Sequence, residues 1–184
     1  MTMTHFRDLT LYSYGVAESS QAGACNIGWL SADVAFPMAS SEPQFVDRLW
    51  RYCKVSVGQT RGLHECEICR SREANVARRN ADELLLGSAE IRVISGQGQL
   101  YAAPNLIYHY VVSHNYSPPP EFVLAVLEGP CPPEEGYYHL LTKMGIDWSN
   151  TLVPERGSKS FRFVKTPEGV VKVDQSGDSS KPSR

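Results

Sequence analysis

The sequence lacks the features that would place the protein in a membrane or in a disulfide-stabilised class. None of its apolar runs approaches the roughly 18 to 20 residues that a transmembrane helix needs. Arg7 and Asp8 interrupt the stretch where a secretory signal would have its apolar segment, so no signal peptide is expected. The chain has 5 cysteines, an odd number, which argues against a disulfide framework and favours a reducing compartment. We therefore expect a cytoplasmic protein that does not associate with a membrane.

The chain also lacks the charge and the motifs of several functional classes. Its formal net charge is -2, which excludes a generally basic nucleic-acid-binding protein. The Gly-x-Ser-x-Gly, His-Glu-x-x-His and Walker motifs are missing, so no catalytic residue is assigned. The 184 residues include 42% hydrophobic side chains, which is enough to build a core. This composition predicts one folded domain of ordinary size.

The pattern of apolar and turn residues predicts a single α+β domain over residues 1–175 and a disordered tail over 176–184. The predicted strands lie at 6–14, 26–30, 89–94, 99–103, 161–165 and 170–174, and the last four form two hairpins. The predicted helices lie at 42–53, 104–114 and 119–128, with a short fourth one at 137–144. Strand and helix blocks do not alternate regularly. We therefore expect a mainly antiparallel sheet with about three packed helices rather than a parallel sheet.

Residues 58–81 differ from the rest of the chain because they contain few large apolar side chains. Such a stretch buries little surface, so something other than a hydrophobic core has to hold it in place. The segment contains Cys66-x-x-Cys69, the sharpest chemical signal of the sequence. Two thiolates at this spacing lie on one tight turn, where both sulfurs can bind one ion at about 2.3 Å. The pattern predicts a zinc-clamped loop.

A tetrahedral zinc site needs two further ligands, and the sequence offers three histidines for them. The spacing of His109 and His114 is typical of Cys2His2 sites, whereas His64 precedes Cys66 by two residues. His64 lies on the cysteine turn and His114 at the end of a predicted helix, so we rank both ahead of His109 in the middle of that helix. Four protein ligands imply a structural site. Reduced thiols without metal and a redox pair remain the alternatives.

The charges are unevenly distributed along the chain. Residues 93–142 contain no Lys or Arg, but they contain several tyrosines together with Glu121, Glu128, Glu134 and Glu135. An acidic surface rich in tyrosine favours a basic protein partner, whereas tyrosines in the core would carry no such implication. Both interpretations remain open. The arginines at 70–79 are partly offset by nearby acidic residues, so nucleic-acid binding is only weakly indicated.

Several stretches together resemble an uncharacterised family of small bacterial cytosolic proteins, a domain of unknown function. They include Asn26-Ile-Gly-Trp-Leu30, Gln59-Thr-Arg-Gly-Leu-His-Glu-Cys-Glu-Ile-Cys69 and the stretch from Tyr101-Ala-Ala-Pro-Asn-Leu-Ile-Tyr-His-Tyr110 to Pro119. The resemblance covers about residues 6–128 and includes all five candidate metal ligands. It implies a bacterial source and one domain, but it implies no activity. Some small bacterial proteins act as immunity partners of secreted toxins, which is an analogy.

These observations predict a zinc-stabilised protein-binding module of the bacterial cytoplasm. Its partner would be another protein with a basic surface. The module itself would be either an immunity-type protein that neutralises a toxin or a regulatory protein. Two alternatives belong to other functional classes. One is a thiol-dependent enzyme that uses Cys66 or Cys69 with a nearby histidine. The other is a nucleic-acid-binding regulator that uses the arginines at 70–79.

Overall fold

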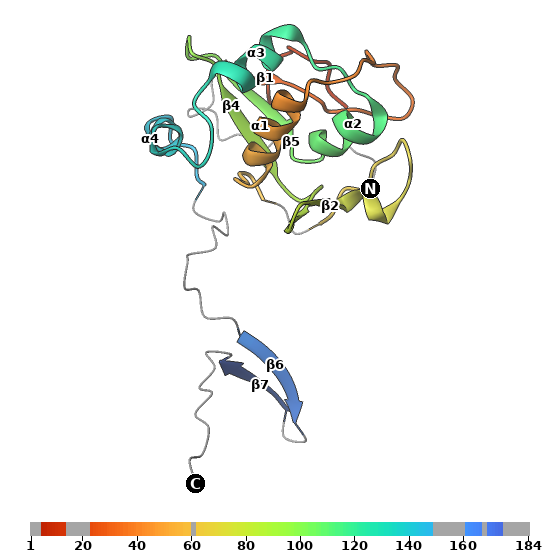
Figure 1. Ribbon diagram of the computed structural model, residues 1–184, viewed down its shortest axis with the longest axis vertical. Helices are drawn as coiled ribbons and strands as arrows, with labels where there is room; N and C mark the ends of the chain where they lie inside the picture. The colour runs from red at the N-terminus through yellow and green to blue at the C-terminus, as the bar shows by residue number, and fades with distance from the viewer. Residues whose placement is uncertain (1–4, 14–22, 60–61, 149–160, 167–168, 175–184) are drawn as a thin grey trace. The chain divides into compact units, whose positions relative to one another are not determined.

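The computed structural model describes residues 5–13, 23–59, 62–148, 161–166 and 169–174 (Figure 1). The chain divides into two compact units, Met1–Leu152 and Val153–Arg184. The predicted tail at 176–184 lies outside the described residues. The α+β fold that the sequence predicted is confirmed, with four helices and a small sheet among the described residues of the first unit.

The centre of the first unit is a mixed three-stranded sheet in the order β1, β5, β4. The strands β4 (Glu90–Ile94) and β5 (Leu100–Pro104) form the predicted antiparallel hairpin, and all their residues are buried. The strand β1 (Cys25–Asn26) pairs with β5 in parallel, which makes the sheet mixed rather than purely antiparallel. The predicted strand at 6–14 is reduced, within 5–13, to an isolated bridge between Leu11 and Cys25.

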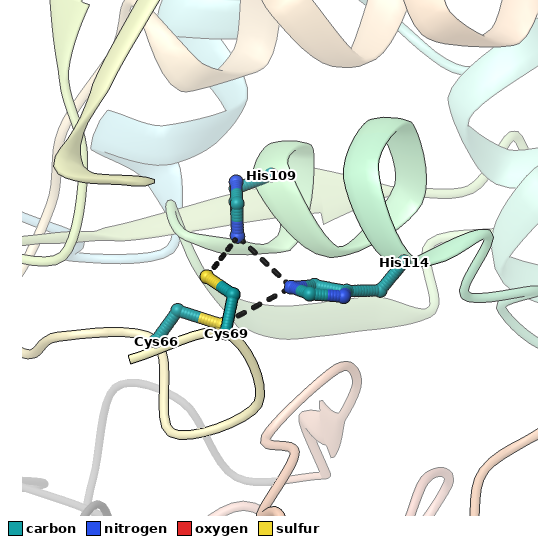
Figure 2. Close-up of side chains that lie close together, drawn as sticks. All are labelled: Cys66, Cys69, His109 and His114. Carbon is teal, nitrogen blue, oxygen red and sulfur yellow. Dashed lines mark hydrogen bonds between the residues drawn. The ribbon is translucent and has the colours of Figure 1, made fainter. Parts of the chain in front are cut away.

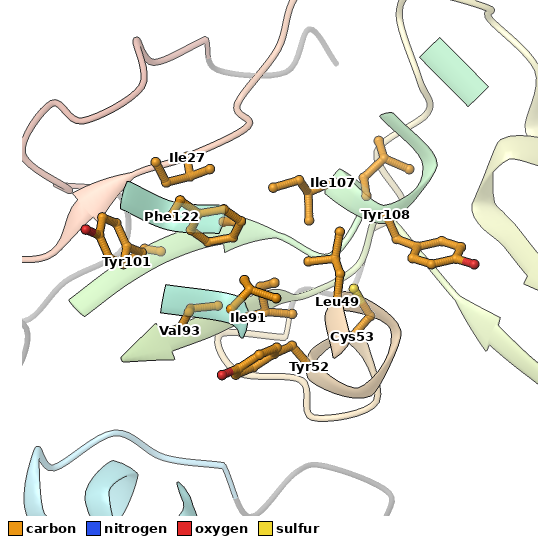
Figure 3. Close-up of a cluster of buried hydrophobic side chains, with 14 of the residues drawn as sticks. Ile27, Leu49, Tyr52, Cys53, Ile91, Val93, Tyr101, Ile107, Tyr108 and Phe122 are labelled. Carbon is orange, nitrogen blue, oxygen red and sulfur yellow. The ribbon is translucent and has the colours of Figure 1, made fainter. Parts of the chain in front are cut away.

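Four helices accompany this sheet, close to the predicted positions. They are α1 (Pro43–Cys53), α2 (Ile107–His114), α3 (Pro120–Glu128) and α4 (Glu135–Lys143). Proline occupies the first turn of both α1 and α3, where its missing N–H costs nothing. The helix α1 packs against β4, α2 and α3 (Figure 1). Its apolar face buries Phe45 and Leu49. Figure 3 shows Leu49 among the buried hydrophobic side chains of the core.

The core contains most of the tyrosines of residues 93–142. Tyr101, Tyr108, Tyr110, Tyr116 and Tyr137 are all buried, and Tyr138 is half-buried. Of the two interpretations of this span, the structure therefore favours tyrosines in the core over an exposed tyrosine-rich surface. A basic partner would therefore have to bind through other residues.

A buried ionic network is centred on β4. Arg92 Nη1 lies 2.7 Å from Glu90 Oε2, and the two side chains are only 2% and 7% exposed. The Tyr12 hydroxyl donates a 2.8 Å hydrogen bond to the same carboxylate, and Arg92 in turn donates to that hydroxyl at 3.2 Å. The Tyr137 hydroxyl of α4 donates to the backbone carbonyl of Arg92 at 2.7 Å. These bonds connect the N-terminal segment, the sheet and α4.

Residues 72–85 form a second hairpin of the first unit, which the sequence did not predict. A short 3₁₀ turn (Arg72–Asn75) leads into β2 (Val76–Arg79), and β3 (Asp82–Leu85) returns antiparallel to it. Asn80 makes the connecting turn with a φ of 54°, a conformation that Asn tolerates better than most residues. Arg78 and Glu83 are opposite each other in the register and form an ion pair of 2.8 Å. The sequence signal for this hairpin was the presence of opposite charges on the two sides of Asn80.

The second unit contains the predicted C-terminal hairpin. Its strands β6 (Phe161–Thr166) and β7 (Gly169–Asp174) pair antiparallel and form a two-stranded sheet of their own. Among the described residues, no helix has the length and apolar character that crossing a bilayer requires.

Candidate metal centre

The cysteine loop, residues 62–71, is anchored by backbone hydrogen bonds ahead of the cysteines. The His64 N–H donates to the Gly87 carbonyl at 2.8 Å, and the Asn75 side chain donates to the His64 carbonyl at 2.7 Å. Gly87 has a φ of 87°, and a Cβ there would lie 2.4 Å from the His64 carbonyl oxygen. Only glycine therefore permits this close approach.

The two cysteines lie on one tight turn of this loop. Residues 67–69 form the turn, and the Arg70 N–H closes it by donating to the Cys66 carbonyl at 2.8 Å. The Cys66 side chain is fully buried, whereas Cys69 is exposed. This geometry agrees with the sequence-based expectation that both sulfurs can bind one ion from a single turn.

The two histidines come from the last two turns of α2. Five positions on an ideal helix are about 140° apart, so His109 and His114 would not share a face in a continuous helix. His114 is the last helical residue, and Asn115 leaves the helix with a left-handed φ of 53°. The two imidazole rings point toward each other edge to face, with centroids 4.8 Å apart (Figure 2). The end of the helix thus brings both Nε2 atoms to the cysteine turn.

Four ligand atoms meet at this point, and all lie within 4.8 Å of one another. Cys66 Sγ is 3.3 Å from His114 Nε2, Cys69 Sγ is 3.5 Å from His109 Nε2, and the two Nε2 atoms are 3.1 Å apart (Figure 2). In a tetrahedral zinc site the bond lengths imply S···N edges of about 3.6 Å and N···N edges of about 3.3 Å. These three separations are slightly shorter than the tetrahedral edges, and the remaining ones do not exceed 4.8 Å, so the cluster is close in size to a zinc coordination sphere and could hold such an ion.

Burial sets the protonation of the cluster. Desolvation raises the pKa of the Cys66 thiol to about 11. Desolvation and, second, the neighbouring His114 lower the pKa of His109 to about 4, and desolvation also lowers the pKa of His114. Both shifts favour the neutral imidazole, which is the form that binds metals. A cation would favour the thiolate that burial alone disfavours, and the mixed sulfur and nitrogen donors suit zinc.

His64 is the candidate that the structure does not bring to this group. The cluster contains Cys66, Cys69, His109 and His114, whereas His64 serves the site through its backbone, as described above. The sequence ranking of His64 ahead of His109 is therefore not what the geometry shows. That ranking assumed that a mid-helix histidine is poorly placed for a ligand, but here the packing of α2 directs the His109 ring to the cysteine turn.

A matched pair of substitutions tests which of His109 and His64 binds the metal. We expect His109→Ala to lower zinc affinity by at least about tenfold, because it removes one of four ligands. His64→Ala should keep the affinity, because its anchoring bonds are made by the backbone. A competition titration against a chromophoric chelator measures both. Loss of metal in His64→Ala with normal affinity in His109→Ala would contradict the assignment.

The fold and the site together define an α+β domain in which a Cys2His2 group, a potential metal site, bridges a loop and a helix. The chain belongs to the family described as Domain of unknown function (DUF7919), whose model matches residues 4–127. The resemblance to a domain of unknown function is thereby confirmed. The match includes the whole cluster, whereas α4 and the C-terminal hairpin lie beyond it. No curated protein and no solved structure matches the chain.

Proposed function

We propose that this chain is a zinc-stabilised protein-binding module of the bacterial cytoplasm. The observation that carries the proposal is the four-donor cluster of Cys66, Cys69, His109 and His114. Four protein ligands complete a tetrahedral sphere and leave no position for a reacting water, which is typical of structural zinc. When bound, the ion would act as a cross-link between the cysteine loop and α2. Its binding free energy would then contribute to the stability of the fold.

A groove beside the cluster supplies a surface for the partner. It has a volume of about 560 Å³ and is lined by Ala32, Asp33, Leu63, Glu65, Cys66, Glu67 and Arg70. Among the described residues of this lining, three carboxylates stand against one guanidinium, and Leu63 is 53% exposed. This combination favours a partner that offers a cationic group next to an apolar one. We therefore expect a basic partner to bind at this groove and not at the tyrosines, which are buried.

The position of the groove makes partner binding dependent on the metal. Glu65 and Glu67 flank Cys66 in the chain, so the cross-link to α2 fixes the segment that carries both carboxylates. A rigid binding surface loses less conformational entropy on association. This surface would suit either of two roles for the chain: an immunity-type protein that covers a basic toxin, or a regulatory protein that binds another basic protein. The identity of the bound protein distinguishes the two roles.

The two alternative functions draw less support from the structure. For a thiol-dependent enzyme, burial raises the pKa of Cys66, which disfavours a reactive thiolate in the metal-free protein. For a nucleic-acid-binding regulator, Arg78 pairs with Glu83 and Arg79 pairs with Asp47. These ion pairs offset part of the charge that would contact phosphates.

Charge reversal in the groove tests the proposed partner. The zinc-loaded full chain is used to capture proteins from its native host, and the captured protein is then purified for titration. We expect Asp33→Lys combined with Glu65→Lys to weaken binding of that protein by at least about tenfold, with a dependence on salt. The control is Glu121→Lys, an exposed acidic residue in the first turn of α3 that does not line the groove.

Two results would contradict this surface assignment. One is an unchanged affinity in the double variant when its zinc content equals that of the wild type. The other is an equal loss of affinity in Glu121→Lys. Zinc content is measured for each variant first, so that a damaged metal site is not mistaken for a lost contact.

A further inference from the structure

We propose that Cys66 and Cys69 form a peroxide-sensitive modification site, where oxidation to a disulfide between them releases the metal and frees the cysteine loop from α2. This inference rests on the proposed zinc site and adds a means of regulating it.

The cysteines of the chain differ sharply in exposure. Of the five, Cys69 alone is exposed, Cys25 is half-buried, and Cys53, Cys66 and Cys131 are buried. An oxidant in solution therefore reaches Cys69 more readily than the buried cysteines. Cys53 and Cys131 lie in the core, where burial raises the pKa of both thiols and leaves them unreactive. Cys66 is buried as well, but its sulfur belongs to the same cluster as that of Cys69.

The turn geometry brings a resolving thiol to the exposed one. The two Sγ atoms lie within 4.8 Å of each other on a turn closed by the hydrogen bond from Arg70 N–H to the Cys66 carbonyl. A disulfide has an S–S length of about 2.05 Å, so the sulfurs need to approach by less than about 3 Å. We expect movement of the Cys69 side chain on this turn to supply the approach, and the peptide mapping described below tests it.

The reaction balances with hydrogen peroxide as the oxidant. The Cys69 thiolate attacks one peroxide oxygen, so that an S–O bond forms, the O–O bond breaks and hydroxide leaves. The Cys66 thiolate then attacks the Cys69 sulfenic acid, so that the S–S bond forms and the S–O bond breaks, with a second hydroxide as the leaving group. The two sulfurs lose two electrons in total, peroxide gains them, and two protons from solvent convert the hydroxides into water.

The disulfide removes half of the ligand set. Neutral disulfide sulfur is a poor zinc donor, so His109 and His114 alone would be left to hold the ion. The loop keeps its attachment ahead of the cysteines through His64 and Gly87, and behind them through Ser71, whose hydroxyl accepts from the Glu73 N–H. The change is therefore confined to residues 65–70, which carry two of the groove carboxylates.

Treatment of the zinc-loaded full chain with hydrogen peroxide tests the proposal. We expect one equivalent of zinc to reach a chromophoric chelator, a Cys66–Cys69 disulfide in peptide mapping by mass spectrometry, and recovery of zinc binding after a dithiol reductant. Cys25→Ser is the matched control, since Cys25 is the other accessible thiol and lies outside the cluster. Its zinc release should have the same rate as that of the wild type, within about twofold.

Each other outcome is decisive. Zinc retained with intact thiols, release with sulfinic acid but no disulfide, or a disulfide that involves Cys25 would each overturn the proposal. If the protein contains no zinc when purified under reducing conditions, the proposed metal site itself fails, which is a different result from zinc that is bound but not released. A Cys69→His variant that still binds zinc should resist release, because it keeps four donors and cannot form the disulfide.

Discussion

Replacement of Cys66 by Ser is expected to abolish zinc binding and to lower the free energy of unfolding by several kcal/mol. A serine hydroxyl is a poor zinc ligand, and at this position it would be buried without the partner that the sulfur had. The binding free energy of a structural ion is also folding free energy, so losing one ligand destabilises the domain. Elemental analysis and urea unfolding of both proteins measure the two effects.

Cys25→Ser is the control for this experiment. Cys25 is half-buried, belongs to β1 and is not part of the ligand cluster. Its replacement should leave the zinc content unchanged and cost no more than about 1 kcal/mol. Equal zinc content and an equal unfolding midpoint in Cys66→Ser and the wild type would refute a structural role for the cluster.

Removal of the Glu90 carboxylate is expected to have the second large effect. Glu90→Ala would remove the carboxylate that pairs with the buried Arg92 guanidinium and accepts from the Tyr12 hydroxyl. Breaking a buried ion pair on one side costs about 3–5 kcal/mol, because the remaining charge stays desolvated. We expect this loss in chemical unfolding, with zinc content per folded chain unchanged.

The matched control is the exposed ion pair of the β2–β3 hairpin. Arg78 and Glu83 lie 2.8 Å apart, but their side chains are 72% and 59% exposed. Glu83→Ala should therefore change the free energy of unfolding by at most about 1 kcal/mol. Similar decreases in the free energy of unfolding for Glu90→Ala and Glu83→Ala would show that burial does not determine how much these ion pairs contribute to stability.

The helices and the hairpins with strong turns were predictable because their signals are local. Proline in the first turn and a periodic apolar face define α1, and a glycine-containing turn defines the β4–β5 hairpin. The strand expected at 26–30 shows the limit of such signals. Gly28 has a φ of 69°, and the run leaves the extended conformation after Asn26 although it stays buried. The apolar run indicated burial correctly, but not the backbone conformation.

The candidate site was predictable only in part. The spacing of Cys66 and Cys69 restricts both sulfurs to one turn, so their meeting is a local property. The choice among the histidines is not local, because it depends on how α2 packs against the cysteine loop and on where that helix ends. The burial of the tyrosines is likewise a tertiary property. An uncharged aromatic side chain in an acidic stretch has no local signal that separates core from surface.

The metal content of the chain, purified without added metal under reducing conditions, tests the central claim most directly. We predict one zinc ion per chain by elemental analysis, and thiols at 66 and 69 that a maleimide labels only after a chelator has removed the ion. A chain that is folded, contains no metal, gains none on addition of zinc and carries a freely labelled Cys69 would contradict the account.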